Sequence, residues 1–550
     1  MSKTKNRETA SRDGGTVEHR LARLLDSTPL EKVVPHLAPE TLHQLIRYRG
    51  LEACGEVITS ATRAQLTSLV DLDLWHHAQP GRDEQFDVER FGEWLETLAE
   101  MGDSAAARTI AALDTHVVIT GLSRYLRVFD PGTLEPAFSS DDELLDRHEL
   151  MNSEMSGDEV ECELGGYLLR ARRTDAWDAI LAVLGALEIE HAEHFHAVMQ
   201  GCRDLSDSAP EIDGLDDLQT KPEQQMYDVA IERDQRRSRL GYATPADARA
   251  FLQMARQPPR TRASSAPASP IARNPIATAY FRATEEEDED APAVSEPGGA
   301  DVEASVDAVI ELLAEAGMLP QQPRALLSAG DDEPAAPLPL LRRLMESVLH
   351  RDKTEYLSRG RELGFLANTM LAGCSVQSRA FTPQEASDAV AGICNLGLER
   401  WPGKAIDSET FLVEHDLVAV FEVGWSILYE EVTLFVADQL LSILGGLRSG
   451  DDDTVRELRT LQRRLATERE AGKPWLAREA ADVLAMLDTT AWISVLGLLD
   501  ECPILPAALS AVLERRTTPV SPTAFQFIST TAQLADIRAF MRALPGMLSS

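Results

Sequence analysis

Cysteine and aromatic residues are scarce in this chain of 550 residues. The six cysteines lie far apart and none forms a C-x-x-C pair, which excludes a zinc ribbon or a thioredoxin-type motif. They are also too sparse for a disulfide scaffold, so we expect reduced thiols and a cytoplasmic location. Aromatic residues make up only 5% of the chain while leucine and alanine are abundant, a mixture that favours helix-on-helix packing over sheets.

Long uninterrupted apolar runs are missing too. The first 15 residues are polar and lack the apolar stretch of a signal peptide. The most apolar segment, Phe411 to Leu447, is broken by acidic residues that would be costly in lipid: Glu414, Asp416, Glu422, Glu430, Glu431 and Asp438. We therefore expect no membrane insertion and interpret this segment as a buried pair of helices.

Positive charge is in short supply, because 53 Lys and Arg face 90 Asp and Glu and the net charge is −37. Such a surface repels nucleic-acid phosphates and anionic lipids, so we expect neither as a partner. The sequence also has no G-x-x-x-x-G-K-[ST] loop, G-x-G-x-x-G turn or G-x-S-x-G elbow. No motif therefore specifies a cofactor or a catalytic residue.

Apolar residues recur at helical spacing along most of the chain, which predicts an all-α protein with two multi-helix parts. We expect a disordered tail over residues 1–16 and an N-terminal helical domain over 17–256. Two similar phrases, PETLHQL from Pro39 and TRAQLTSL from Thr62, favour stacked helical hairpins up to about residue 126. Chance similarity between leucine-rich helices is the alternative.

A change of composition separates the two parts. Residues 257–304 are rich in proline, alanine and serine and include an acidic run, Glu285 to Asp290. Such a segment buries too little apolar surface to offset the entropy of ordering, so we predict a disordered linker. A C-terminal helical bundle is expected over residues 305–550, with a capping box, Thr382 to Glu385, opening one of its helices.

Two histidines interrupt the apolar stripe of a long helix predicted between about Thr174 and Cys202. His191 and His194 are three residues apart, so in one helix they share a face, with Glu190 on the flank. Imidazoles at this spacing hold a metal ion when carboxylates complete the shell. The alternative is that both are packed, hydrogen-bonded side chains, since no H-E-x-x-H motif is present.

A basic stretch stands out in this acidic chain, Arg233 to Arg239. Arg233 and Arg237 lie one helical turn apart and could hold a carboxylate or phosphate. The alternative is pairing with acidic residues of the same protein. Cys374 and Cys394 lie among small residues, and we interpret them as buried packing groups where two helices approach closely.

Several phrases resemble a bacterial domain-of-unknown-function family, the one numbered 6178. They are LARLLDSTPLEKVVPHLAPETLHQLI from Leu21, LGFLANTMLAGCSVQSRAFTPQEASDAVAGICNLGLE from Leu363, and RRSRLGYATPADARAFL from Arg236. The resemblance extends over most of the chain outside the linker and implies no activity. The N-terminal helices are also similar in style to the cytosolic helical domain of MgtE-type magnesium transporters, without that family's membrane helices.

Three functions remain open on the sequence alone. The absence of catalytic motifs and the layered helices favour a non-enzymatic scaffold or regulatory module that binds a protein partner. The second is a helical metalloprotein or metal-dependent enzyme using His191 and His194. The third is a sensor of an anionic ligand using Arg233 and Arg237. The sequence does not specify the oligomeric state.

Overall fold

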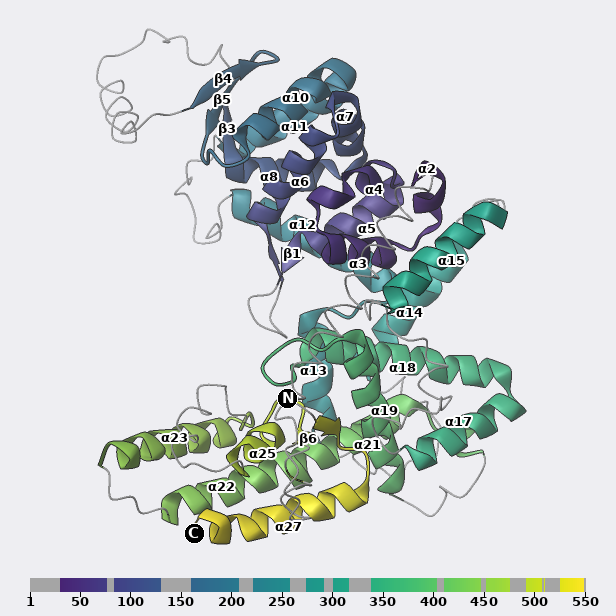
Figure 1. Ribbon diagram of the computed structural model, residues 1–550, viewed down its shortest axis with the longest axis vertical. Coiled ribbons are helices and arrows are strands. Elements are labelled where there is room, and N and C mark those ends of the chain that lie inside the picture. The colour runs from purple at the N-terminus through teal and green to yellow at the C-terminus, as the bar shows by residue number, and fades with distance from the viewer. Residues whose placement is uncertain are drawn as a thin grey trace, which may run out of the picture. The chain divides into compact units, whose positions relative to one another are not determined.

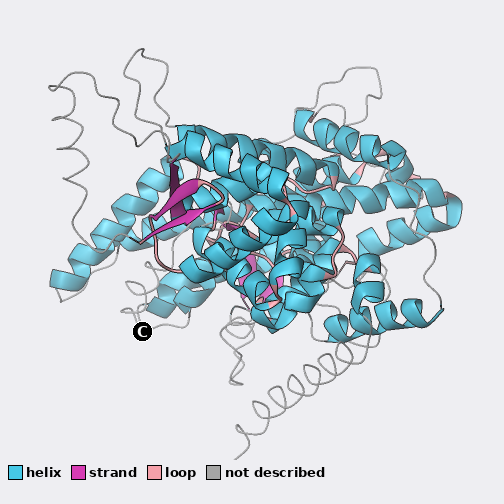
Figure 2. Cartoon of the chain, turned by 90° about the horizontal axis from the view of Figure 1, so that it is seen from above, coloured by secondary structure: helices cyan, strands magenta, loops and turns pink. Residues whose placement is uncertain are grey.

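A computed structural model describes residues 30–76, 84–129, 160–206, 221–257, 274–290, 300–315, 338–402, 410–446, 452–474, 491–506, 509 and 525–548. Within these residues the chain is helical apart from three small antiparallel sheets (Figure 2). The predicted all-α class is confirmed. In the same residues, no helix is both long and apolar enough to cross a membrane. The predicted tail, residues 1–16, lies outside the described residues.

The chain divides into two compact units, which are described separately. The N-terminal unit comprises residues 1–76, 85–236 and 292–319, and the C-terminal unit comprises residues 77–84, 237–291 and 320–550. These boundaries differ from the predicted domains, because residues 237–256 belong to the C-terminal unit and residues 305–319 to the N-terminal one. Amino-acid composition shows where the chain changes from apolar to polar segments. Which unit a helix belongs to depends instead on which apolar faces pack together.

Short helices build the N-terminal unit (Figure 1). In order they are α2 (Leu30–Val33), η1 (Val34–His36), α3 (Pro39–Arg49), η2 (Glu52–Cys54), α4 (Gly55–Thr59), α5 (Arg63–Asp73), α6 (Val88–Glu100), α7 (Asp103–Ala112), α8 (Thr115–Tyr125), α10 (Trp177–Glu190), α11 (Ala192–Ser206), most of α12 (Lys221–Arg239) and α15 (Ala300–Glu315). Their buried leucines, valines and aromatics form one continuous core.

The two similar phrases noted in the sequence both begin helices that pack against each other. Pro39 opens α3 at a position where its missing N–H costs nothing. Thr62 caps α5 in a capping box with Gln65, whose amide also donates to the carbonyls of Val34 and Leu37, each at 2.7 Å. These local signals place both helix starts, while the solenoid-like repeat stays a prediction.

A three-stranded sheet covers part of this core, with strand order β3 (Leu126–Phe129), β5 (Tyr167–Ala171), β4 (Glu161–Leu164). Strand β3 follows α8 directly. The hairpin of β4 and β5 turns on Gly165 and Gly166, whose φ values of 58° and 82° suit a two-residue turn. Two further strands, β1 (Trp75–His76) and β2 (Gln85–Phe86), pair after α5.

Longer helices build the C-terminal unit around a second apolar core. They are α13 (Pro245–Ala255), α14 (Pro275–Asp290), α17 (Pro339–Arg351), α18 (Lys353–Gly373), α19 (Pro383–Glu399), α20 (Phe411–Glu414), α21 (Leu417–Ile427), the π-helix η6 (Leu428–Leu434), α22 (Phe435–Gly446), α23 (Asp452–Glu470), α25 (Ala491–Leu498) and α27 (Thr531–Leu548); β6 (Ile504–Pro506) pairs with β7 (Phe525–Phe527). The predicted capping box of Thr382 and Glu385 is present at the start of α19.

Helices α19 and α21 cross closely in this core, as the small residues around Cys394 predict. A Cβ on Gly397 would lie 2.1 Å from the Val420 carbonyl oxygen, and one on Gly424 would lie 2.0 Å from the carbonyl oxygen of Ile393. Only glycine permits this backbone approach. The Cys394 thiol is buried at the same crossing.

The segment predicted as a helix pair between Phe411 and Leu447 has a different form. After the single turn of α20, the chain is helical without a break from Leu417 to Gly446, and its middle seven residues form a π-helix. Asp416 caps the long helical stretch, and Glu431 in the π-helix binds Arg538 at 2.7 Å. Two of the six acidic residues that interrupt the apolar run are thus a helix cap and an ion-pair partner.

Part of the predicted linker is structured. Helix α14 packs against the C-terminal core through Ala277, which is fully buried, and through Tyr280, whose hydroxyl donates to the Gly241 carbonyl at 2.7 Å. The prediction of a disordered segment over residues 257–304 is therefore wrong for α14. The apolar residues near its start supply a short packing stripe that the average composition conceals. Residues 258–273 and 291–299 lie outside the described residues.

Candidate functional site

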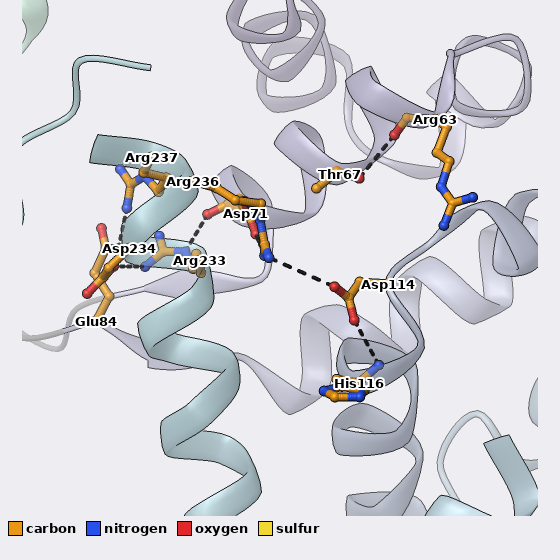
Figure 3. Close-up of polar contacts among 10 residues, drawn as sticks. All are labelled: Arg63, Thr67, Asp71, Glu84, Asp114, His116, Arg233, Asp234, Arg236 and Arg237. Atoms are coloured by element: carbon orange, nitrogen blue, oxygen red, sulfur yellow. Dashed lines mark hydrogen bonds and ion pairs between the residues drawn. The ribbon is translucent and has the colours of Figure 1, made fainter. Parts of the chain in front are cut away.

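The basic end of α12 is held by residues of its own unit. The guanidinium of Arg233 is buried, and its Nε donates to the Asp71 carbonyl at 2.8 Å (Figure 3). Its guanidinium carbon lies 4.8 Å from the centre of the Trp75 ring. Hydrogen bonding and cation–π attraction both compensate the loss of hydration. Arg233 thus joins α12 to the end of α5 rather than presenting charge to a ligand.

The neighbouring Arg236 strengthens the same junction. Its Nε and Nη2 donate to the two carboxylate oxygens of Asp71 at 2.9 and 2.8 Å, and its Nη1 lies 3.9 Å from Asp114, the residue that caps α8 (Figure 3). This bidentate bond raises the pKa of Arg236, despite the opposing effect of burial. Three helices, α5, α8 and α12, therefore meet at one ion-pair network.

Arg237, the first residue of the C-terminal unit on α12, has different partners. Its Nη1 donates to Glu84 at 2.7 Å and its guanidinium carbon lies 4.8 Å from the centre of the Tyr242 ring. Arg233 and Arg237 therefore do not converge on one anion site, although they lie one helical turn apart. The alternative of internal pairing describes them better, with partners far away in sequence.

The histidine pair lies at a break between helices. The predicted single helix from Thr174 to Cys202 is wrong, because α10 ends at Glu190 and α11 begins at Ala192, with His191 between them at φ −136° and ψ 55°. The His191 amide still donates to the Leu187 carbonyl, and its own carbonyl accepts from the Phe195 amide. His191 is thus the last cap of one helix and the first acceptor of the next.

The hydrogen bonding of these histidines is unusual. The Nε2 atoms of His191 and His194 are both buried and have no hydrogen-bond partner in the described structure. Burial lowers the pKa of His194, and the positive charges of His191 and Arg63 lower it further. By contrast, His196 is exposed and its Nδ1 lies 3.3 Å from the Tyr167 hydroxyl.

The predicted metal shell is not assembled around this pair. Glu190 accepts a hydrogen bond from the Ser104 hydroxyl at 3.1 Å. Across the ranges that the structure describes, no group of three or more His, Cys, Asp or Glu is arranged to hold a metal ion. Within the described residues, His191, His194 and Glu190 therefore do not form a three-ligand site.

The two cysteines singled out in the sequence are packing groups. Cys374 and Cys394 are fully buried, and burial raises the pKa of each thiol, which opposes formation of the nucleophilic thiolate. The structure therefore agrees with the prediction that both cysteines are buried packing groups.

One surface was not foreseen from the sequence. On α18, Leu357 is 65% exposed, and the same face carries Lys353, Gly360, Arg361 and Gly364 at spacings of three and four. A Cβ placed on either glycine would meet no atom within 4 Å. The opposite face of α18 is buried, so the exposed face became recognisable only once the packing of the helix was known.

Fold and contacts define a helical protein in which the arginines of α12 pair internally and α18 has an exposed face with one leucine and two glycines. Residues 13–211 match the family model described as "Family of unknown function (DUF6178)". This part of the chain is therefore similar to that family, in agreement with the resemblance stated for Leu21 onward. The match does not extend to the phrases from Arg236 and Leu363. No curated protein and no solved structure matches the chain, and the likeness to MgtE-type transporters gains no support.

Proposed function

We propose that this protein is a non-enzymatic scaffold that binds a helix of a partner protein on the exposed face of α18. The exposure of Leu357 carries this proposal. Burying the remaining two thirds of a leucine side chain is worth about 1–2 kcal/mol, so a partner that covers Leu357 gains a central apolar contact.

Gly360 and Gly364 support a helix as the occupant. Glycine within a helix costs about 1 kcal/mol relative to alanine, and neither glycine makes room for a neighbour in the described structure. Their cost is offset if another backbone approaches α18 closely, as small residues allow at helix crossings. The Gly397–Val420 crossing shows the same device inside the C-terminal unit.

Charge indicates the chemistry of the partner. Lys353 lies four residues before Leu357, on the same exposed face of α18. In a chain with a net charge of −37, this local positive charge favours an amphipathic helix that carries acidic residues around an apolar anchor. We therefore propose that the partner is an acidic helical segment of another protein.

Site-specific photo-crosslinking tests the proposal. A photoreactive amino acid replaces Leu357 in the full chain in its native cells, and a matched protein carries it at Leu349, which is 38% exposed on α17. We expect position 357 to capture one partner in a helical segment rich in Asp and Glu, and position 349 to capture it much less.

Reconstitution with the captured protein then measures affinity. Leu357→Ser should weaken binding by about tenfold, as expected for loss of about 1.4 kcal/mol, whereas Leu349→Ser should leave it within about twofold. Lys353→Glu should weaken binding most at low salt. Crosslinks only to a second copy of the chain, or equal effects of both leucine substitutions, would refute the proposed docking face.

A further inference from the structure

Helix α12 has a solvent-facing side that the packing of the N-terminal unit leaves uncovered. Of its 19 residues, Val229 and Arg233 are the buried ones. On the opposite side of the helix, Tyr227 is 59% exposed and Ile231 is 37% exposed. Residues four positions apart are neighbours on a helix surface, so these two side chains form one apolar stripe rather than two scattered groups.

The buried side of α12 fixes the position of this stripe. Val229 belongs to the apolar core of the N-terminal unit. The Arg233 Nε donates to the Asp71 carbonyl at 2.8 Å, and Arg236 makes its two bonds to the Asp71 carboxylate at 2.9 and 2.8 Å (Figure 3). A surface that is already ordered loses little conformational entropy when a partner binds. The stripe is therefore prepared for binding before the partner arrives.

The charges beside the stripe are negative. Asp228 and Glu232 are exposed, lie one helical turn apart and follow directly after Tyr227 and Ile231. The arginines of this part of α12 bind Asp71 from the other side, and Lys221 lies at the first residue of the helix. The face of the Tyr227 ring also attracts cations. A cationic side chain would thus meet two carboxylates and an aromatic ring, whereas a phosphate or carboxylate would be repelled.

From this arrangement we infer that the exposed face of α12 at Tyr227 and Ile231 binds a basic amphipathic helix of a second protein. The one-turn spacing of the two apolar groups matches the spacing of apolar residues along a facing helix. Lys or Arg residues beside the apolar stripe of that helix would pair with Asp228 and Glu232. A second copy of this chain is disfavoured, because it would bring another acidic flank to a protein with a net charge of −37.

This surface goes beyond the proposed function and does not depend on it. It uses residues of the N-terminal unit and a basic partner, whereas the α18 face belongs to the C-terminal unit and is proposed to bind an acidic partner. Opposite charges beside the two apolar contacts would keep the two partners from exchanging places. The two surfaces together would let the chain join one basic and one acidic protein.

Photo-crosslinking in native cells identifies the segment that covers this face. A photoreactive amino acid replaces Tyr227 in the full chain, and a matched protein carries it at Ile189, which is 84% exposed on α10 between Glu188 and Glu190. We expect position 227 to crosslink to one segment rich in Lys and Arg, and position 189 to capture that segment much less. A synthetic peptide of the captured segment then serves as the ligand in titrations of the full chain.

Serine substitutions measure the apolar contact. Tyr227→Ser and Ile231→Ser should each weaken binding of the peptide by about tenfold, as expected for central contacts of an interface. Ile189→Ser is the control for an exposed apolar residue outside the stripe and should leave the affinity within about twofold. Leu357→Ser should also leave it within about twofold, which separates this surface from the docking face on α18.

Charge reversal tests the acidic flank. An Asp228→Lys, Glu232→Lys double variant should bind the peptide about tenfold more weakly, and it should bind a copy of the peptide with Glu in place of Lys and Arg more tightly than the natural chain does. Glu52→Lys, Glu56→Lys makes the same change of charge at another exposed pair of the N-terminal unit and should alter neither affinity by more than about twofold.

Four results would overturn the inference. The first is that position 227 captures nothing, or only a second copy of the chain or an acidic segment. The second is that both serine variants keep the natural affinity for the peptide. The third is that the two double variants weaken binding equally, since the peptide would then respond only to the net charge of the chain. The fourth is that Leu357→Ser abolishes binding, since the peptide would then occupy α18.

Discussion

Asp73 is the residue whose replacement tests the electrostatics of the N-terminal unit most directly. Its carboxylate is almost fully buried and accepts hydrogen bonds from the Arg90 guanidinium at 2.8 and 3.1 Å and from the Trp94 indole at 2.7 Å, with the His43 imidazole at 3.4 Å. Burial by itself would raise the pKa of Asp73, yet these donors lower it from 3.8 to about 2.

This shift sets the expected magnitude. A pKa lowered from 3.8 to about 2 corresponds to roughly 2 kcal/mol of stability that the charged carboxylate contributes at neutral pH. Asp73→Asn keeps one acceptor but removes the charge, so we expect a loss of about 2–3 kcal/mol. Because the folded pKa is lower than the unfolded one, the contribution is complete above about pH 4 and disappears as the pH falls towards 2.

Urea unfolding with pulsed hydrogen exchange provides the assay, because peptides from α5 and α6 report on this unit alone. Glu93→Gln is a matched control, since Glu93 binds the same Arg90 at 2.7 Å from an exposed position and should contribute less than about 1 kcal/mol. The reasoning is refuted if Asp73→Asn unfolds at the urea concentration of the natural chain at neutral pH. It is refuted equally if the difference between them persists undiminished near pH 2.

Three further predictions concern the C-terminal unit. Gly397→Ala should destabilise it by about 3 kcal/mol or more, because the added methyl would overlap the Val420 carbonyl, and the urea midpoint of α19 peptides measures the loss. Burial raises the pKa of Glu362 to about 7, despite its ion pair with Arg359, so this carboxyl makes the unit less stable as the pH rises from about 4.5 to 7. Glu362→Gln should remove that decline, which thermal unfolding across this pH range detects, and an unchanged decline would contradict the assignment. Gly360→Ala should raise the stability of the isolated chain by about 0.5–1 kcal/mol while weakening binding of the photo-crosslinked partner, and improved binding would contradict the docking face.

Local signals explain which parts of the fold could be predicted. The helix starts at Pro39, Thr62, Thr244 and Thr382 follow from a cap or a first-turn proline acting on residues three or four positions away. The glycine-rich neighbourhood of Cys394 likewise indicated a close helix crossing, which Gly397 and its neighbours form. Such local signals act within about one helical turn, so they do not depend on how the rest of the chain packs.

The candidate sites could not be predicted in the same way. The sequence does not distinguish ligand binding from internal pairing for Arg233, because its partner, the Asp71 carbonyl, lies 162 positions earlier in the chain. The apolar period continues through His191 and so predicts both histidines on one helical face, whereas the helix is interrupted at His191. The period of the apolar residues gives the average direction of side chains over several turns. It does not show that a helix is interrupted at one residue.

The sequence alone determined the helical class, the acidic surface and most helix starts, because each depends on composition or on neighbours within one turn. Tertiary structure decided that α14 packs as a helix, that the arginines of α12 pair internally, and that one face of α18 is left exposed. Burial is the physical reason for this division. Whether a side chain meets water, a carbonyl or another side chain depends on segments hundreds of residues apart, which only the folded chain brings together.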